Sequence, residues 1–172
     1  MDRRGLLLGA LALTATPAVA KPGRVRLALL GQALIEHALP EEQWPGRRAV
    51  ARELAKADLG FTNLETVVKG PRAGAPTREA LTLHTAQPAV LDALKAMNIR
   101  LLATANNHAF DLGSGGILDT VDAIERAGLI SAGSGADLAR AAAPAFARTA
   151  GGSVALVAFA TGKVREGGAA TN

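Results

Sequence analysis

Cysteine is absent from all 172 residues of this sequence. The absence excludes disulfide bonds, a cysteine nucleophile and thiolate ligands for a metal. A chain without disulfides must be stabilised by burial, which favours a packed domain over a small cross-linked scaffold. Any metal ion would have to be held by His, Asp, Glu, Asn or backbone oxygens. Such a set of donors indicates a hard or borderline divalent ion.

Aromatic residues and net charge are also scarce. Only four Phe and one Trp are present, so few side chains could stack on nucleic-acid bases. The formal net charge is +4, and the arginines are scattered along the chain rather than grouped. A strongly basic patch is the usual electrostatic sign of a nucleic-acid-binding domain. We therefore exclude nucleic acid as a partner.

The first twenty residues have the pattern of an export signal. Arg3 and Arg4 precede an uncharged stretch from residue 5 to residue 20, which ends in the small-residue sequence Ala-Val-Ala. The stretch is shorter than the ~20 residues of a membrane-spanning helix, and its end is typical of a cleavage site. The paired arginines resemble a twin-arginine signal. We predict that residues 1–20 are removed and that the protein is periplasmic or extracellular; an uncleaved N-terminal anchor is the alternative.

Removal of the signal leaves residues 21–172, which is 172 minus 20, or 152 residues. The signal takes two of the 19 basic and one of the 15 acidic residues, which leaves 17 against 14, or about +3. This length is sufficient for one domain with a hydrophobic core.

Strand-like and helix-like patterns alternate along this part of the chain. The alternation predicts an α/β fold with a mostly parallel sheet and an antiparallel hairpin near the end. A sheet of this kind needs cover on both faces, and the last expected strand has no helix after it. We therefore expect residues 21–172 to be the N-terminal part of a larger domain. The expected strands are 25–30, 58–63, 81–84, 99–103 and 129–130; the expected helices are 47–57, 88–98 and 117–127, with a helical turn at 137–141 and hairpin strands at 146–149 and 153–159.

Polar residues follow three of the expected strands. Gln32 follows the first strand, Glu65 the second, and Asn106, Asn107 and His108 follow the strand at 99–103. The carboxyl ends of parallel strands meet at one edge of the sheet, where α/β proteins commonly place their sites. A carboxylate, amides and an imidazole at that edge favour a divalent ion. The alternative is that the asparagines only form side-chain turns and that His108 caps the next element.

Two segments carry a resemblance to a known family. Residues 57–65 read ADLGFTNLE and are similar to the ADLVFGNLE segment of the poly-γ-glutamate capsule-synthesis family of CapA or PgsA type. Residues 102–113 read LATANNHAFDLG and are similar to the SLANNHALDYG segment of that family. The similarity extends from about residue 25 to residue 159, in the order and spacing of the family.

The resemblance implies a fold and a site. The family resembles the calcineurin-like metallophosphoesterases, whose α/β/β/α sandwich carries a two-metal centre on the loops at its strand ends. By this resemblance Glu65 stands at an acidic metal ligand and Asn107 at a ligand asparagine. His108 stands at the histidine that stabilises the leaving group or donates its proton. Two such ions would clamp a phosphoryl group and lower the pKa of a bridging water.

The sequence departs from the family pattern in two places. The first family motif is Gly-Asp, whereas Gly31 is followed here by Gln32, which offers a metal an oxygen but no charge. The later Gly-His-x-His motif of the family has no counterpart, because the only histidines are His37, His84 and His108. We therefore expect at most half of a metal site. His84 is interpreted as structural, and His37 is close enough to Gln32 for a loop to turn it toward the site.

Three hypotheses of function follow. In the first, an exported member of the family assists assembly or release of an anionic exopolymer, with metal-assisted hydrolysis or transfer at a phosphate or amide. In the second, a non-catalytic scaffold binds the polymer or the envelope polymer-synthesis machinery, and its metal site is degenerate. Either protein could associate with a membrane through its partners. The third is a nucleotide-binding domain that uses the glycines of residues 113–116, although their spacing matches no phosphate-binding motif.

Overall fold

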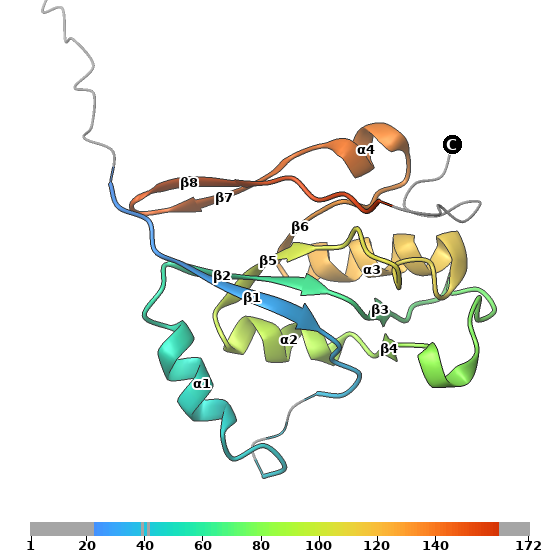
Figure 1. The fold of residues 1–172 in the computed structure, drawn as a ribbon, viewed down its shortest axis with the longest axis horizontal. Helices are drawn as coiled ribbons and strands as arrows, with labels where there is room; N and C mark the ends of the chain where they lie inside the picture. Colours follow the sequence, from blue (N-terminus) through green and yellow to red (C-terminus); the bar gives the residue numbers. More distant parts are fainter. Residues whose placement is uncertain (1–22, 39, 41, 162–172) are drawn as a thin grey trace, which may run out of the picture.

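A parallel sheet lies at the centre of the structure, a computed structural model that describes residues 23–38, 40 and 42–161 (Figure 1). Its four strands run in the order β1-β2-β5-β6, and every neighbouring pair is parallel. The mainly parallel α/β fold expected from the sequence is thereby confirmed, whereas the predicted signal at residues 1–20 lies outside the described residues. The strands are β1 (Leu27–Ala33), β2 (Leu59–Leu64), β5 (Ile99–Ala103) and β6 (Ile130–Ala132).

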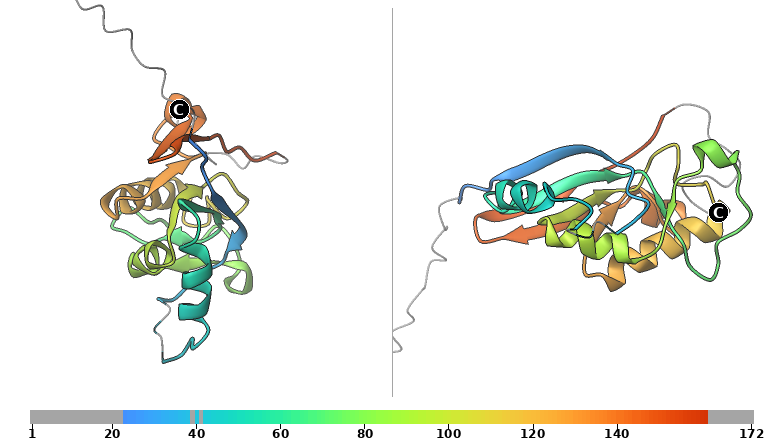
Figure 2. Two further views of the ribbon diagram at one scale, coloured as in Figure 1. Left: turned by 90° about the vertical axis from the view of Figure 1, so that its left-hand side faces the viewer. Right: turned by 90° about the horizontal axis from the view of Figure 1, so that it is seen from below.

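Helices α2 (Ala89–Ala96) and α3 (Gly113–Arg126) cover one face of the sheet (Figure 2). Their apolar residues pack with those of the strands into the main core, in which Leu102 and Ile124 are completely buried. Burial of this kind stabilises the fold by roughly 25 cal/mol for each Å² of apolar surface removed from water. Helix α1 (Arg47–Leu54) contributes little, because none of its residues is fully buried.

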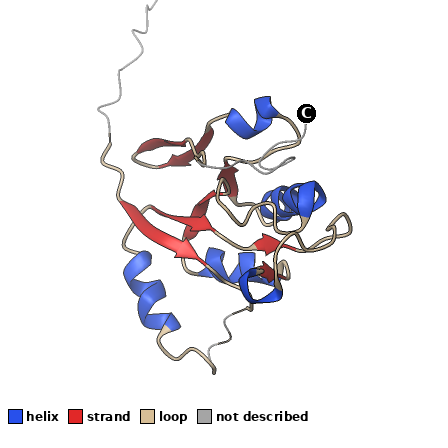
Figure 3. Ribbon diagram, turned by 45° about the vertical axis from the view of Figure 1, so that its right-hand side comes forward, coloured by secondary structure: helices blue, strands red, loops and turns tan. Residues whose placement is uncertain are grey.

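The opposite side of the sheet is partly covered by the predicted C-terminal hairpin, formed by β7 (Ala145–Thr149) and β8 (Gly152–Leu156) (Figure 3). Ala147 of the hairpin packs against Leu59 and Leu101 of the sheet. The short helix α4 (Leu138–Ala142) precedes the hairpin. Leu29, which lies in register with Phe61 on this side, is 73% exposed, so the hairpin leaves the β1 side of this face open.

The strand predicted at residues 81–84 is wrong. A 3-10 helix occupies Ala80–Thr82, and Leu81 is 94% exposed, so its apolar side chain does not mark a buried strand. The strand β4 (Thr85–Ala86) follows and pairs with β3 (Val67–Val68), which the sequence pattern did not predict. Both strands have only two residues, which is too short for an alternating pattern to appear.

Helix α3 begins at Gly113, earlier than residue 117 predicted for it. Two glycines in its first turn lie in close contact with neighbouring residues. A Cβ atom on Gly115 would lie 1.8 Å from the backbone oxygen of Arg72, and one on Gly116 would lie 2.7 Å from Cβ of Leu112. These contacts account for the absence of side chains at Gly115 and Gly116, so nucleotide binding is not needed to explain these two glycines.

The loop that covers this helix is held by an ion pair. The Arg72 backbone N and Nε each donate to the buried Asp119 carboxylate at 2.8 Å, and NH2 of Arg72 donates to Asp122. The hydrogen bond to Asp119 raises the pKa of Arg72 above its ordinary value. Arg78 lies six residues further along the same loop and pairs with Asp111.

Asn98, the residue predicted to stop helix α2, lies just beyond its C-terminal cap Met97. Its φ of 62° is left-handed, a conformation that asparagine tolerates at helix ends. Its side-chain amide donates to the backbone oxygens of Leu54 and Ala57, and so ties α2 to the end of α1. No helix within the described residues is long and apolar enough to cross a membrane.

Candidate functional site

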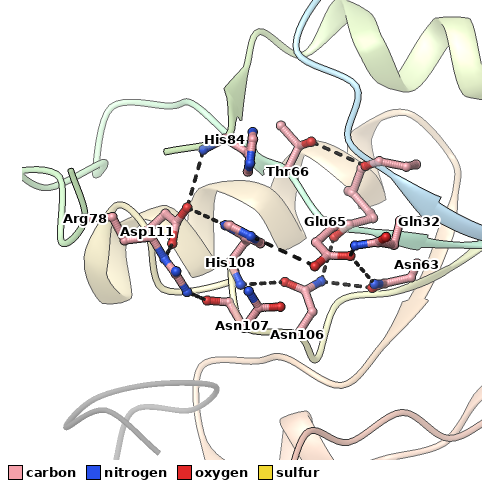
Figure 4. Close-up of polar contacts among 12 residues, drawn as sticks. Gln32, Asn63, Glu65, Thr66, Arg78, His84, Asn106, Asn107, His108 and Asp111 are labelled. Carbon is pink, nitrogen blue, oxygen red and sulfur yellow. Dashed lines mark hydrogen bonds and ion pairs between the residues drawn. The ribbon is translucent and has the colours of Figure 1, made fainter. Parts of the chain in front are cut away.

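Glu65 and His108 meet at the carboxyl edge of the sheet (Figure 4). Glu65 directly follows β2, and His108 lies in the loop between β5 and α3. Because β2 and β5 are adjacent and parallel, their loops emerge at the same edge. Oε1 of Glu65 lies 4.0 Å from Nε2 of His108, and the two residues are only 5% and 8% exposed. The structure therefore brings together an acidic and an imidazole side chain from two separate loops.

Glu65 is also bound by two amides through its other oxygen. Gln32 Nε2 donates to Oε2 at 2.5 Å, and Asn63 Nδ2 donates to the same oxygen at 2.9 Å. Gln32 and Asn63 are register partners on β1 and β2. The residue that replaces the acidic residue of the family motif thus lies directly against Glu65.

Asn106 connects the two loops. Its Nδ2 donates to Oδ1 of Asn63 at 3.0 Å and to the backbone oxygen of Leu64 at 2.8 Å, while its Oδ1 accepts from the backbone N of His108. Sequence reasoning placed Asn106 in the site loop but gave it no role. The sequence shows two adjacent asparagines, Asn106 and Asn107. Only the structure shows which of the two side chains turns inward.

Asn107 itself is exposed. Its backbone oxygen accepts a hydrogen bond from Arg78, and no hydrogen bond joins its side chain to Glu65 within residues 23–38, 40 and 42–161. Its role as a metal ligand stays a prediction.

Asp111 holds one nitrogen of the His108 ring. Its Oδ2 lies 2.9 Å from Nδ1 of the imidazole, and its Oδ1 pairs with Nε of Arg78. Asp111 is 1% exposed, so this carboxylate is buried and relies on these partners. A carboxylate only accepts hydrogen bonds, which places the hydrogen of His108 on Nδ1 and directs Nε2 toward Glu65. Arg78 was not predicted, because an arginine in a polar loop has no distinguishing pattern.

Of the remaining two histidines, His84 contacts this centre and His37 lies in the wall of a cavity. The ring of His84 contacts that of His108 edge to face, with centroids 4.7 Å apart, and its Nδ1 lies 2.6 Å from Oε1 of Glu36. His84 is therefore adjacent to the site rather than remote from it. His37 is exposed and lines, together with Gln32, a cavity of about 400 Å³ whose other walls are mainly apolar.

The donor types around Glu65 are those that a single divalent cation accepts, and they do not fit a two-metal centre. The carboxylate of Glu65 and amide oxygens suit a hard or borderline ion. No group of three or more acidic, histidine or cysteine residues with metal-binding geometry occurs among the residues that the structure describes. Gln32 and Asn63 direct their NH2 groups at Glu65, so each amide would have to turn its oxygen inward to contact a cation.

The fold and site define a parallel α/β domain with a carboxylate, amide and imidazole site at its strand ends. Residues 26–172 match the family described as bacterial capsule synthesis protein PGA_cap. The chain belongs to this family, as the resemblance in its sequence predicted.

Relatives among known proteins share this region. The protein y4uA of Sinorhizobium fredii, which is named as uncharacterized, is 34% identical over 135 residues, or 77% of this chain and 29% of the relative. A probable polyglutamine synthesis accessory protein of Mycobacterium tuberculosis is 36% identical over 97 residues, or 56% of this chain and 25% of the relative. The chain thus spans 29% or less of the length of these curated relatives.

Proposed function

We propose that this chain forms the site-bearing part of an accessory protein for synthesis of an anionic exopolymer of the poly-γ-glutamate type. Membership of the capsule-synthesis family supports this role, and so does the name of the mycobacterial relatives. The export pattern of residues 1–20 supports a location outside the cytoplasm, in the periplasm or beyond the cell. The partners are then the polymer itself or the envelope machinery that makes it, and any contact with the membrane is made through those partners.

We propose further that the site holds one divalent cation at Glu65. The observation that carries this proposal is the approach of the buried Glu65 and His108 side chains, with 4.0 Å between Oε1 and Nε2. Amide oxygens of Gln32 and Asn107 would complete the set of ligands. When bound, such an ion polarises a phosphoryl or carbonyl oxygen and activates water.

The protein's own contribution is the oriented imidazole. Asp111 holds the hydrogen of His108 on Nδ1, so Nε2 is the atom that can exchange a proton with a substrate at Glu65. This arrangement favours hydrolysis or transfer. To protonate a leaving group, Nε2 must first take up a proton, so the ring would act as an imidazolium held by Asp111. Binding of the cation should be weak, because Glu65 is the only anionic ligand in the proposed set.

A second candidate function is binding without catalysis. The hydrogen bonds of Gln32 and Asn63 satisfy one oxygen of Glu65 without any cation, so the carboxylate is stable as part of a purely structural network. In that case the domain would act as a scaffold for the polymer machinery, and Gln32 would mark a metal position that no longer functions.

Calorimetric titration of the full chain with Mn²⁺ or Zn²⁺ separates the two candidates. We expect binding with a dissociation constant on the order of 10⁻⁴ to 10⁻³ M, as for weak oxygen-ligand sites. Glu65→Ala should abolish the binding, whereas Glu125→Ala, an exposed change on α3, should leave it intact. Absence of binding in the unmodified chain would support the scaffold function, and equal binding by Glu65→Ala would place the ion elsewhere.

A further inference from the structure

A second imidazole–carboxylate pair lies beside the His108–Asp111 pair. Glu36 comes from the loop after β1, and His84 comes from the segment between the 3-10 helix and β4. Oε1 of Glu36 lies 2.6 Å from Nδ1 of His84, and the side chains are 40% and 26% exposed. Since the carboxylate accepts, Nδ1 of His84 carries the hydrogen, which fixes the tautomer of this ring as well.

His84 contacts both members of the His108–Asp111 pair. Its ring meets the His108 ring at an interplanar angle of 69°, with centroids 4.7 Å apart (Figure 4). Edge-to-face packing at this separation is a favourable geometry for aromatic rings. In addition, the backbone N of His84 lies 3.4 Å from Oδ2 of Asp111, the oxygen that also accepts from Nδ1 of His108.

We propose that Glu36 and His84 are positioning residues for His108. The hydrogen bond to Asp111 fixes only one atom of the His108 ring, so the ring could still tilt about that contact. The edge of His84 lies against the ring and limits this tilt, and Glu36 holds His84 in place. The direction of Nε2 toward Glu65 is therefore set by residues of three loops rather than by Asp111 alone.

The inference goes beyond the proposed function, because it concerns the His108 ring in the metal-free protein. A purely structural alternative is that Glu36 and His84 only tie the loop after β1 to the segment before β4. That alternative predicts lower stability when the pair is broken, but no change in the hydrogen position or orientation of His108.

Long-range nitrogen–proton NMR of the imidazoles in the full chain, recorded without metal, distinguishes the two. The chain has three histidines, so single substitutions assign every ring. In the unmodified protein we expect one His108 tautomer with the hydrogen on Nδ1. His84→Ala should introduce the Nε2–H form of His108, which the pattern of nitrogen–proton couplings reports. His84→Phe, which keeps a ring against His108, should restore the Nδ1–H form.

Changes at Glu36 test the outer half of the pair. Glu36→Ala should introduce the Nε2–H form of His108, as His84→Ala does. Glu36→Gln should keep the Nδ1–H form, because its amide oxygen still accepts from Nδ1 of His84. The exposed change Glu125→Ala is the control. A His108 ring that keeps the Nδ1–H form alone in folded His84→Ala would overturn the proposal. If His84→Ala does not fold, the same result in Glu36→Ala would overturn it. Absence of metal binding in the unmodified chain would count against the proposed function only. It would not affect this proposal, because these spectra are recorded without metal.

Discussion

The charge of residue 32 decides how Glu65 is stabilised. Gln32 Nε2 lies 2.5 Å from Oε2 of Glu65, so a neutral donor is in contact with a buried carboxylate. A donor at this position satisfies the carboxylate without a cation. A second carboxylate there would instead repel the first and require a proton or a metal ion between them.

Gln32→Glu tests this relation, because it keeps the length of the side chain and replaces the donor with an anion. We expect affinity for Mn²⁺ or Zn²⁺ to rise by at least about tenfold, which corresponds to about 1.4 kcal/mol. In EDTA the same variant should unfold at a lower temperature than the unmodified protein. Calorimetric titration and thermal melting measure the two effects.

The control for this change is Gln87→Glu, which adds the same charge at an exposed position. It should alter neither metal affinity nor melting in EDTA. An unchanged affinity in Gln32→Glu would show that residue 32 does not face the ion. Gln32→Asp, which matches the family motif but is shorter, should act in the same direction.

At the residue scale, the sequence predicted which loops meet but not which atoms touch. Gln32, Glu65 and His108 could be assigned to one edge because the ends of adjacent parallel strands coincide. The choice between Asn106 and Asn107, and the partners Asp111, Arg78 and Glu36, depend on side-chain directions in irregular loops. Such loops have no periodicity from which a direction could be derived.

At the scale of elements, long apolar patterns were reliable and short ones were not. The strand at 99–103 was predicted with its observed bounds. The helix that follows Pro88 ends at Ala96, two residues before the Asn98 that was expected to stop it. The segment 81–84 failed because alternation over so few residues does not distinguish a strand from a turn. The start of α3 was missed because glycine disfavours helices. The presence of Gly115 in the helix is explained by its contact with Arg72, which the sequence does not reveal.

Gly115→Ala tests whether this packing sets the start of α3. The added methyl group would lie 1.8 Å from the Arg72 oxygen, so the loop must move away from the helix. We expect a loss of about 1–3 kcal/mol in the free energy of unfolding, as for other overpacked sites. Urea denaturation followed by circular dichroism measures it.

Gly46→Ala is the matched control, since a Cβ atom at Gly46 meets no atom within 4 Å. It should change the free energy of unfolding by no more than about 0.5 kcal/mol. Replacement of glycine by alanine otherwise favours the helix and restricts the unfolded chain. No loss in Gly115→Ala, or equal losses in the two variants, would therefore show that contact with Arg72 does not set the cost.

At the scale of the whole molecule, the fold places one site at the edge of a sheet whose other surfaces are unequally covered. Helices α2 and α3 bury one face, while Leu27 and Leu29 on the opposite side are 41% and 73% exposed. The sequence predicted the class of fold because strands and helices alternate. It could not predict the extent of cover on each face, which depends on where the hairpin packs.

Export of the molecule is a separate prediction. We expect the protein recovered outside the cytoplasm to begin at Lys21, because cleavage after Ala-Val-Ala removes the uncharged stretch. Mass spectrometry of the exported protein determines its N-terminus. Joint substitution of Arg3 and Arg4 by lysine should block export by the twin-arginine route; unchanged export would assign the general secretory route, and an intact N-terminus would contradict cleavage.

The most direct test of a shared Glu65 and His108 site is paramagnetic broadening of the histidine NMR signals by Mn²⁺. An ion held at Glu65 would lie close to His108, since the two side chains are 4.0 Å apart. We predict that substoichiometric Mn²⁺ broadens the His108 signals in the unmodified chain and in Glu125→Ala, and that Glu65→Ala removes the effect. Broadening of His108 that persists in Glu65→Ala, or signals that stay sharp in the unmodified chain at millimolar Mn²⁺, would contradict a cation site at Glu65.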